Sequence, residues 1–503
     1  MRKKFLLLLA LPLLALFPLS AQEDDRLFVI AAFEFDITGR TRPDALLHNA
    51  ELRVGEEIRG MEALERFVRD RTQLLVNTRV LDAVEIAFSV GEARPDGAFP
   101  VTLAISAAGT MNVIAIPVPY FHSHTGFEFD VRARDYNFLG TMSPLRLNLG
   151  YSLDEYRQSS FNVMLTSVIP FTAWGLRWSF LFENIFEYRP DVDEPFFFRN
   201  NTGLSVELPF GGTTLTVGFE ESFLLNDENH RRYRDLYGDF QSGIFMSSTA
   251  FASWRVPFGF SDVRFGEVAY TVSPSMTFVH EMPGQPALHG FRRGPFAEVS
   301  HSLGLGRIDW HGNFRRGFSV SLGNSFFYDV SGYDVFQDPF HATLGFTGVA
   351  HLILADFLGL SARMQTRRWV FFGGNGYNDE AGNVLRGISD RSIHADHMLS
   401  FNFNLPFRVF VFEPSRWFGI ERLRFFNFEF HASPMFDFAF FNDPSAGSDV
   451  AATGGIELVV FPEAMRSLYL RFSFGVNALE LLRTRSLPGG SNREISISMG
   501  HHF

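Results

Sequence analysis

Beyond Gly109 the chain consists of segments of about ten residues in which apolar and polar side chains alternate, separated by polar or glycine-rich breaks. Clear examples are Leu145–Leu149, Phe401–Leu405 and Phe426–Phe430. Because successive side chains of a strand point to opposite faces, this period suits a wall with lipid on one side and a polar lumen on the other. Among sheets, only a closed one can cross hydrocarbon without unpaired backbone groups. We therefore predict an all-β transmembrane antiparallel barrel over residues 108–503.

The composition separates this prediction from two other fold classes. A soluble β-sandwich would also alternate, but it would not need nearly 400 residues or so many phenylalanines, of which the chain has 60. A mean hydropathy of +0.03 argues against a bundle of transmembrane helices, each of which would need about 20 apolar residues. The phenylalanines instead suit a lipid-facing wall and its aromatic girdles.

Residues 1–21 carry the one long apolar run of the chain. They begin with the basic residues Arg2–Lys4 and end in small residues before a polar segment, the pattern of a cleaved signal peptide. The alternative is a retained helical anchor, which Pro12 and Pro18 disfavour. Removal of the peptide with its three basic residues would change the formal net charge from −12 to −15. The absence of cysteine excludes a disulfide scaffold in an exported chain.

The residue pattern of segment 22–107 predicts a small α+β domain. The segment is long enough for only one such domain. Apolar residues at helical spacing over Gly60–Asn77 predict a helix, and apolar runs between turn residues predict strands. The predicted order is β-α-α-β-β, with the elements Leu27–Phe35, Arg42–Asn49, Gly60–Asn77, Val80–Val90 and Pro100–Ser106.

A glycine-rich stretch, Phe371–Ile388, interrupts the alternation. Its glycines disfavour both helix and strand, so it is predicted to be a loop that either faces outside or folds back into the lumen. The guanidinium of Arg386 would need a carboxylate partner in a lumen. The alternative is an ordinary surface loop.

The order FFGG, a short spacer and then Leu385-Arg386-Gly387-Ile388 resembles the inward-folded loop of the BamA-type superfamily, in which a POTRA domain precedes a bacterial surface antigen barrel. Ile388 stands where that family usually has an aromatic residue. The α+β segment likewise resembles a POTRA domain; an unrelated α+β domain of the same size is the alternative. Further stretches that resemble family signatures are Arg132–Thr141, Phe314–Phe318, Ser433–Asp437 and Leu470–Gly475.

This resemblance implies a functional loop within about 371–396. Its members would be Gly373, Gly374, Leu385, Arg386, Gly387 and Ile388. Asp437 would be the acid that faces Arg386. Family members commonly offer a glutamate on the strand after the loop, whereas Asn402 and Asn404 stand here, which weakens the case for a second acidic partner.

The number of strands can be counted in two ways. Candidate segments number 18, thirteen before the Arg386 loop and five after it, whereas the BamA-type pattern has eleven and five. On the resemblance we predict 16 strands, with two early segments within Ser247–Phe278 assigned to loop structure.

The last residues, Glu494–Phe503, alternate and end in phenylalanine, like the C-terminal signal by which barrels are recognised for assembly. Its members would be Ile495, Ile497, Met499 and Phe503. Chance is the alternative for the final residue alone, because phenylalanine is so frequent in this chain.

Nothing in the sequence indicates catalysis. His122 with His124, and His501 with His502, make no convincing metal site, because adjacent strand residues point apart and the first pair suits polar lining. We find no nucleophile motif, no phosphate loop and no basic patch for nucleic acid. The chain is therefore predicted to be a non-enzyme without cofactors.

Two function classes remain. The first is an outer-membrane assembly factor or translocase, whose periplasmic N-terminal domain receives unfolded outer-membrane or secreted polypeptide clients, with periplasmic accessory proteins as further partners. The resemblance implies that clients pass into the lipid bilayer at a weak seam between the first and last strands. The second class is a passive outer-membrane channel or receptor. The clients, the oligomeric state, and the choice between main assembly factor, paralogue and secretion pore stay open.

Overall fold

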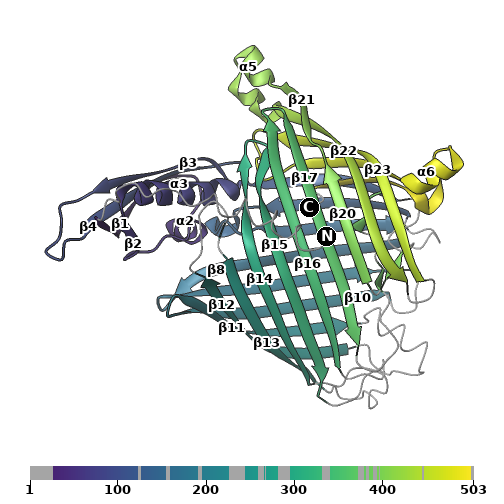
Figure 1. Cartoon of the computed structure of the whole chain (residues 1–503), viewed down its shortest axis with the longest axis horizontal. Coiled ribbons are helices and arrows are strands. Elements are labelled where there is room, and N and C mark those ends of the chain that lie inside the picture. Colours follow the sequence, from purple (N-terminus) through teal and green to yellow (C-terminus); the bar gives the residue numbers. More distant parts are fainter. Residues whose placement is uncertain are drawn as a thin grey trace, which may run out of the picture.

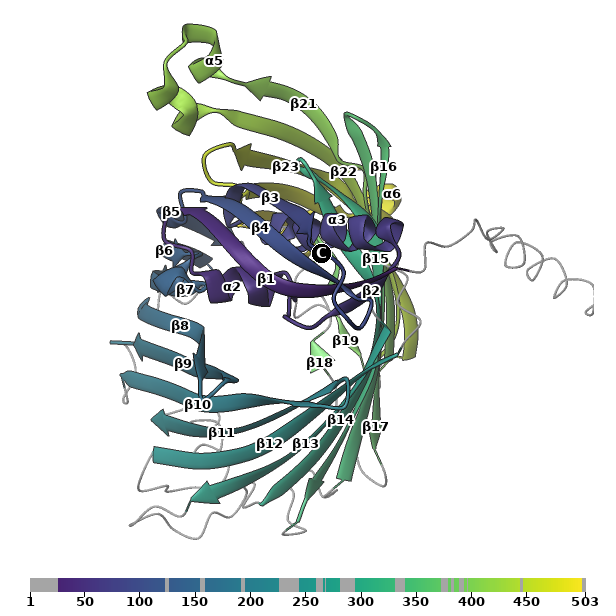
Figure 2. The ribbon, with the colours of Figure 1, turned by 90° about the vertical axis from the view of Figure 1, so that its left-hand side faces the viewer.

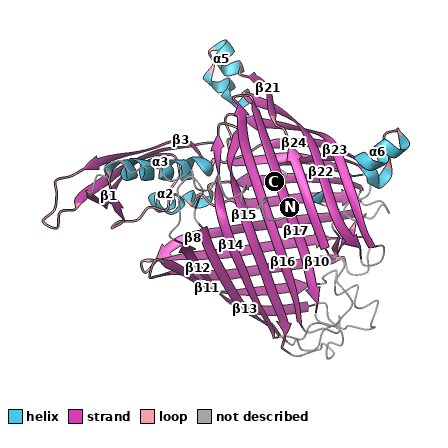
Figure 3. Ribbon diagram, in the orientation of Figure 1, coloured by secondary structure: helices cyan, strands magenta, loops and turns pink. Residues whose placement is uncertain are grey.

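The computed structural model describes residues 26–122, 126–153, 159–190, 195–225, 244–258, 266, 268–280, 295–330, 340–371, 379–380, 384–388, 393–395, 397–443 and 447–499. The predicted signal peptide lies outside these residues. The described chain forms a small α+β part and one large antiparallel sheet (Figure 1). Figure 3 shows that the remaining helices are short and sit at the rims of the large sheet. No described helix is long and apolar enough to cross a membrane.

The N-terminal domain is a four-stranded sheet with two helices. The strand order is β2-β1-β4-β3, with β1 parallel to β4 and the other pairs antiparallel. All five predicted elements are present, and a short extra strand, β2, lies between the helices. β4 extends past the predicted domain boundary at residue 107. The elements are β1 (Leu27–Thr38), α2 (Pro43–Asn49), β2 (Glu57–Arg59), α3 (Met61–Asn77), β3 (Leu81–Val90) and β4 (Phe99–Gly109).

The large sheet, called here the barrel sheet, contains 19 described strands, β5–β17 and β20–β25. Strands follow one another in chain order, and β25 lies beside β5. The strands before the loop are β5 (Val113–His122), β6 (Gly126–Asp135), β7 (Leu145–Leu153), β8 (Ser159–Ala173), β9 (Leu176–Tyr188), β10 (Phe196–Phe210), β11 (Thr213–Leu225), β12 (Ile244–Phe258), β13 (Val268–His280), β14 (Phe296–His311), β15 (Phe314–Asp329), β16 (Phe340–Ala355) and β17 (Leu358–Phe371). Those after it are β20 (His397–Asn404), β21 (Phe407–Phe412), β22 (Phe428–Asp443), β23 (Gly447–Pro462), β24 (Leu470–Asn477) and β25 (Arg493–Met499).

The predicted count of 16 strands is wrong for the described residues. β20 and β21 both pair with β17 and β22 and so occupy one position, which leaves 18 strand positions, thirteen before the loop and five after it. The two segments within Ser247–Phe278 that were assigned to loop structure belong to the strands β12 and β13. The alternation of the sequence was therefore a better guide to the count than the family pattern.

The N-terminal domain lies at the end of the barrel sheet where the described turns are short, such as Gly312–Asn313 between β14 and β15 (Figure 1). Arg79 connects the two parts. Its guanidinium donates to the carbonyl of Gly312 (3.2 Å), to Oδ1 of Asn313 (3.0 Å) and to the carbonyl of Arg466, and it lies 4.2 Å from the ring centroid of Trp310. Burial lowers the pKa of Arg79 to about 10, which leaves it charged at neutral pH.

A second contact joins the domain to the turn between β6 and β7. The side chain of Asn137 donates to the hydroxyl of Thr41 (2.8 Å), and the backbone N–H of Arg42 donates to the carbonyl of Gly140 (3.0 Å). Met142 from this turn is buried in the apolar core of the domain. Because a barrel turn contributes to the core of the domain, the two parts share packed surface as well as polar contacts.

Candidate functional site

Arg386 lies on the inner side of the barrel sheet and contacts Asp437 of β22. Its Nε donates to Oδ2 of Asp437 (2.9 Å), its Nη2 donates to Oδ1, and its backbone N–H also donates to Oδ2 (2.8 Å). Arg386 is 5% exposed and Asp437 1% exposed. The guanidinium therefore meets the carboxylate in the planar, two-pronged geometry that lysine could not reproduce.

A second buried carboxylate completes the cluster. Glu457 of β23 forms an ion pair with Nη1 of Arg386 (3.1 Å) and another with Arg471 of β24 (3.4 Å). Asn404 bridges the two sides, because its Oδ1 accepts from Arg386 (2.6 Å) and its Nδ2 donates to Glu457 (2.7 Å). Within these ion pairs two carboxylates face two guanidiniums, which offsets the cost of burying the charges.

Arg386 has a second acidic partner, Glu457, that the sequence did not predict. The strand after the loop indeed offers no glutamate, but a second acidic partner exists two strand positions further on, in Glu457. Asn402 and Asn404 serve as hydrogen-bonding links: Nδ2 of Asn402 donates to the carbonyl of Val384 (2.8 Å). Glu457 could have been found from the sequence, because it is an acidic residue between the apolar residues Ile456 and Leu458. Period-two alternation places its side chain on the inner face of the sheet.

Gly387 allows the loop to lie directly against β24. Its φ is +106°, and a Cβ there would be 2.5 Å from the backbone nitrogen of Val476 and 2.6 Å from the carbonyl carbon of Gly475. Only glycine fits both the backbone conformation and this close approach. The N–H of Gly387 donates to Oε2 of Glu494 on β25 (3.0 Å), so the loop also contacts the last strand.

Apolar residues hold the loop on both sides of Arg386. Val384, Leu385 and Ile388 pack in a buried cluster with residues of β20, β22 and β23. Figure 2 shows the short strands β18 (Asp379–Glu380) and β19 (His394–Ala395) inside the ring formed by the barrel sheet. Ile388 therefore fills apolar space at the position where an aromatic residue was expected from the family pattern. Gly373 and Gly374 lie outside the described residues.

The predicted C-terminal signal lies partly on β25. Ile495, Ile497 and Met499 pair with Phe474, Phe472 and Leu470 of β24, whereas Phe503 lies outside the described residues. Glu494, Ser496 and Ser498 point inward, since they contact the loop, Ser473 and Arg471 respectively. The isoleucines therefore occupy the outer face.

Where the two ends of the barrel sheet meet, the described parts of the strands are short. β24 and β25 have 8 and 7 described residues and β5 to β7 have 9 or 10, whereas β14, β15 and β16 each have 16.

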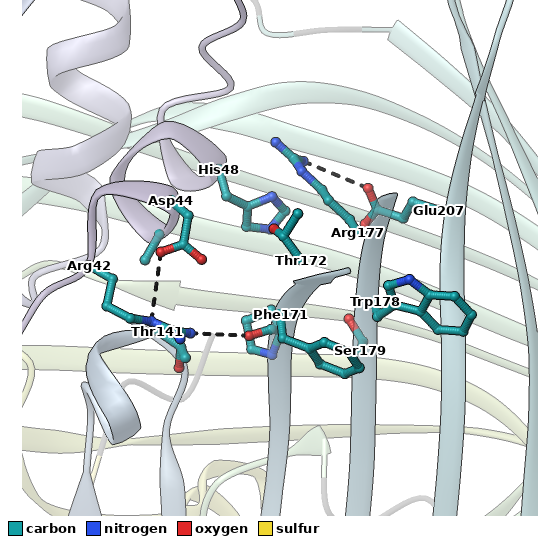
Figure 4. Close-up of a pocket in the computed structure, with 12 residues that line it drawn as sticks. Arg42, Asp44, His48, Thr141, Phe171, Thr172, Arg177, Trp178, Ser179 and Glu207 are labelled. Carbon is teal, nitrogen blue, oxygen red and sulfur yellow. Dashed lines mark hydrogen bonds and ion pairs between the residues drawn. The ribbon is translucent and has the colours of Figure 1, made fainter. Parts of the chain in front are cut away.

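A small pocket of about 40 Å³ lies between α2 and the turns of the barrel sheet (Figure 4). Arg42 donates to the carbonyl of Pro170 (3.4 Å), and Arg177 pairs with Glu207 (3.7 Å). Burial, followed by the positive charge of Arg177, lowers the pKa of His48 below its ordinary value. Such a small, charged pocket suits domain docking better than ligand binding.

The described residues contain no group of three or more His, Asp or Glu side chains placed to hold a metal ion. His124, His501 and His502 lie outside the described residues, and His122 is described by its backbone alone. The ions of the Arg386 cluster are mutually paired. The cluster is built to hold a loop in place.

No protein-family model and no curated protein matches the chain. Among solved structures it is similar to CdiB from Acinetobacter baumannii, at 13% identity over 94% of this chain and 74% of that chain, with a TM-score of 0.46. BamA from Haemophilus ducreyi lacking POTRA domains 1–3 is 13% identical over 94% of this chain and 84% of that chain (TM-score 0.36). CdiB from Escherichia coli is 10% identical over 97% and 92% (TM-score 0.42). These similarities are distant, and the function proposed below rests on the geometry of this chain alone.

Proposed function

We propose that the chain is an outer-membrane protein whose barrel sheet spans the bilayer and inserts or passes polypeptide clients at the junction of β5 and β25. The N-terminal domain stands in the periplasm and receives the clients. Its activity is conformational and needs no cofactor. The observation that carries the proposal is the inward loop, locked by Arg386 to Asp437 and Glu457 and joined by Gly387 to the last strand.

The outer surface of the barrel sheet supports a membrane location. Large apolar side chains that a soluble protein would bury are exposed along many strands. Examples are Phe129, Phe161, Phe219, Leu303, Leu344 and Phe436. Polar and charged partners such as Asp437 and Glu457 lie on the opposite face. This division is what a lipid-facing wall around a polar interior requires.

The N-terminal domain offers a strand edge to clients. β2 covers only Leu27–Val29 of β1, so the stretch Ala32–Thr38 has no strand on that side within the described residues. An unfolded segment can add there by backbone hydrogen bonds, which are indifferent to the client's side chains. A passive channel or receptor, the other function class, needs neither this edge nor a junction that opens.

A disulfide lock across β5 and β25 tests the proposal. Ala115 pairs with Ala133 of β6, whose neighbours Arg132 and Arg134 face inward, so Ala115 points outward. Ser498 points inward, so a crosslink between Ala115 and Ser498 would join opposite faces of the sheet and is avoided. The matched pairs are Ala115 with Ile495 or Ile497, and Ile116 with Ser496 or Ser498.

Any pair that crosslinks has its Cα atoms within about 7 Å. We expect oxidation to stop client assembly or export and reduction to restore it, measured with the chain as the only source of the activity. The single-cysteine variants provide the control for the substitutions themselves. If every crosslinked pair leaves client handling intact while solutes still pass through the lumen, the chain is a passive channel.

A further inference from the structure

The hairpin formed by β21 and β22 extends past its neighbour β17. β17 begins at Leu358, which pairs with Phe407, and the N–H of Arg408 donates to the carbonyl of Phe357 (2.8 Å). The remaining residues of β21 up to Phe412 pair only with β22 in the described chain. This extension of about 15 Å, at roughly 3.3 Å per residue, ends in the helices α5 (Pro414–Phe418) and η5 (Glu421–Phe426). Figure 1 shows it projecting beyond the rim.

The outer face of this extension continues the apolar outer face of the barrel sheet. Since Asp437 of β22 points inward, Phe436 points outward, and Phe428 and Phe430 share its parity. Phe410 stacks on Phe430 with ring centroids 4.5 Å apart, and Phe412 meets Trp417 edge-on at 5.1 Å. Aromatic rings therefore line the outer face of the extension from Phe430 to the tip, and Ala432 and Pro434 separate them from Phe436 on the wall.

The tip itself exposes large apolar side chains. Trp417 is 59% and Phe418 68% exposed, and Ile420, Phe425 and Phe426 are also exposed. On the adjoining turn of β16 and β17, Leu354 and Phe357 are exposed as well. Burial of so much apolar surface would be favourable, and no described segment covers it.

The charge of the tip contrasts with that of the whole chain. Residues 413–426 carry three arginines against two glutamates, in a chain of formal net charge −12. Aromatic rings beside arginines are the composition of segments that lie in the headgroup region of a bilayer, where the rings enter the acyl boundary and the guanidiniums meet phosphates.

We propose that the tip of the β21–β22 hairpin, Glu413–Phe426, is inserted in the headgroup layer of the leaflet that faces the N-terminal domain. This inference rests on the proposed membrane-spanning position of the barrel sheet. The occupant of the exposed aromatic surface is lipid, because the outer face of the hairpin continues the face of the barrel sheet that lipid covers in the proposed function.

The inserted tip would also orient the N-terminal domain. Asp82 of β3 pairs with Arg424 of the tip (3.0 Å) and with Arg466 (3.4 Å). The hydrogen bond that Arg424 donates to the carboxylate of Asp82 raises the pKa of Arg424. A tip held at the membrane surface thereby fixes the height at which the domain stands beneath the barrel.

The absence of cysteine from the chain allows a site-specific test. Single cysteines replace Phe418 at the tip, Phe436 on the wall and Val54, an exposed apolar residue of the N-terminal domain. Each variant is labelled with an environment-sensitive fluorophore and reconstituted in vesicles of phosphatidylcholine and phosphatidylglycerol. Quenching by a spin-labelled phospholipid and by aqueous iodide is then measured. Trp417→Cys replaces Phe418→Cys if the latter fails to fold.

We expect the label at position 418 to show the blue-shifted emission, lipid quenching and loss of iodide quenching of position 436, with position 54 showing the reverse. If position 418 behaves like position 54 while position 436 meets lipid, the tip is not inserted although the barrel spans the membrane. If all three positions meet water, the membrane-spanning proposal fails. Protection at 418 that depends on the protein-to-lipid ratio would instead identify a second copy as the occupant and overturn the inference.

Discussion

The backbone N–H of Gly387 lies 3.0 Å from Oε2 of Glu494 and donates a hydrogen bond to it. Gly387 belongs to the inward loop, whereas Glu494 belongs to β25, the strand that lies beside β5. The residue that follows Arg386 is thus connected to the junction at which the proposed function requires movement. A displacement of the loop can therefore act on the junction of β5 and β25 through the Gly387–Glu494 hydrogen bond and β25.

The Arg386 cluster is expected to stabilise the folded barrel. Arg386→Ala leaves Asp437 and Glu457 without their shared partner, which should cost roughly 3–5 kcal/mol. Asp437→Asn should cost less, because Glu457 still pairs with the guanidinium. The measurement is the temperature at which the folded band on an unboiled gel disappears. Arg94→Ala, at an exposed arginine, is the control, and full additivity of the Arg386 and Asp437 changes would show that the two residues are not coupled.

Gly387→Ala should displace the loop from β24. The new Cβ would lie 2.5 Å from backbone at Val476, and the φ of +106° is unfavourable for alanine, with a cost on the order of 1–3 kcal/mol. Gly489→Ala is the matched control, because its φ is −111° and no atom lies within 4 Å of its Cβ position. Both variants are compared by heat resistance and by client handling. Equal behaviour of the two would contradict a tightly seated loop.

The terminal phenylalanine is predicted from the sequence to serve assembly. Deletion of Phe503 should leave export to the periplasm intact and reduce the amount of folded protein in the outer membrane. Phe503→Tyr, which keeps an aromatic end, should restore most of the yield. Cell fractionation followed by unboiled gels measures both quantities. A normal yield from the deletion would refute the assembly signal.

Docking of α2 against the barrel rim should weaken in mild acid. Burial lowers the pKa of His48 in the folded chain below the ordinary 6.5, so the contact is at full strength above pH 6.5 and weakens as pH falls from there towards the lowered pKa. Hydrogen exchange of α2 in the intact chain, compared at neutral and mildly acidic pH, measures this. His48→Gln should remove the pH dependence, and its persistence in that variant would assign the effect to another group.

Several features could be read from the sequence because they depend on local pattern alone. Alternation predicted that the chain beyond Gly109 consists of strands, and a count of candidate segments gave 18, the number of strand positions in the described residues. Alternation is visible in the sequence because each residue of a strand points to the opposite face from the residue before it. The resemblance, not the pattern, suggested 16 strands.

Only the tertiary structure decided which strands and side chains meet. Glu457 is 71 residues from Arg386, and Glu494 is 107 residues from Gly387; such contacts depend on register between strands that local pattern does not specify. The tertiary structure also decided that the side chains of Ala115 and Ser498 lie on opposite faces of the barrel sheet, because the contacts of their strand partners fix these directions. The projecting tip with Trp417 and Phe418 was also not indicated by the sequence. A strand that extends past its neighbour has the same local alternation as a strand that does not.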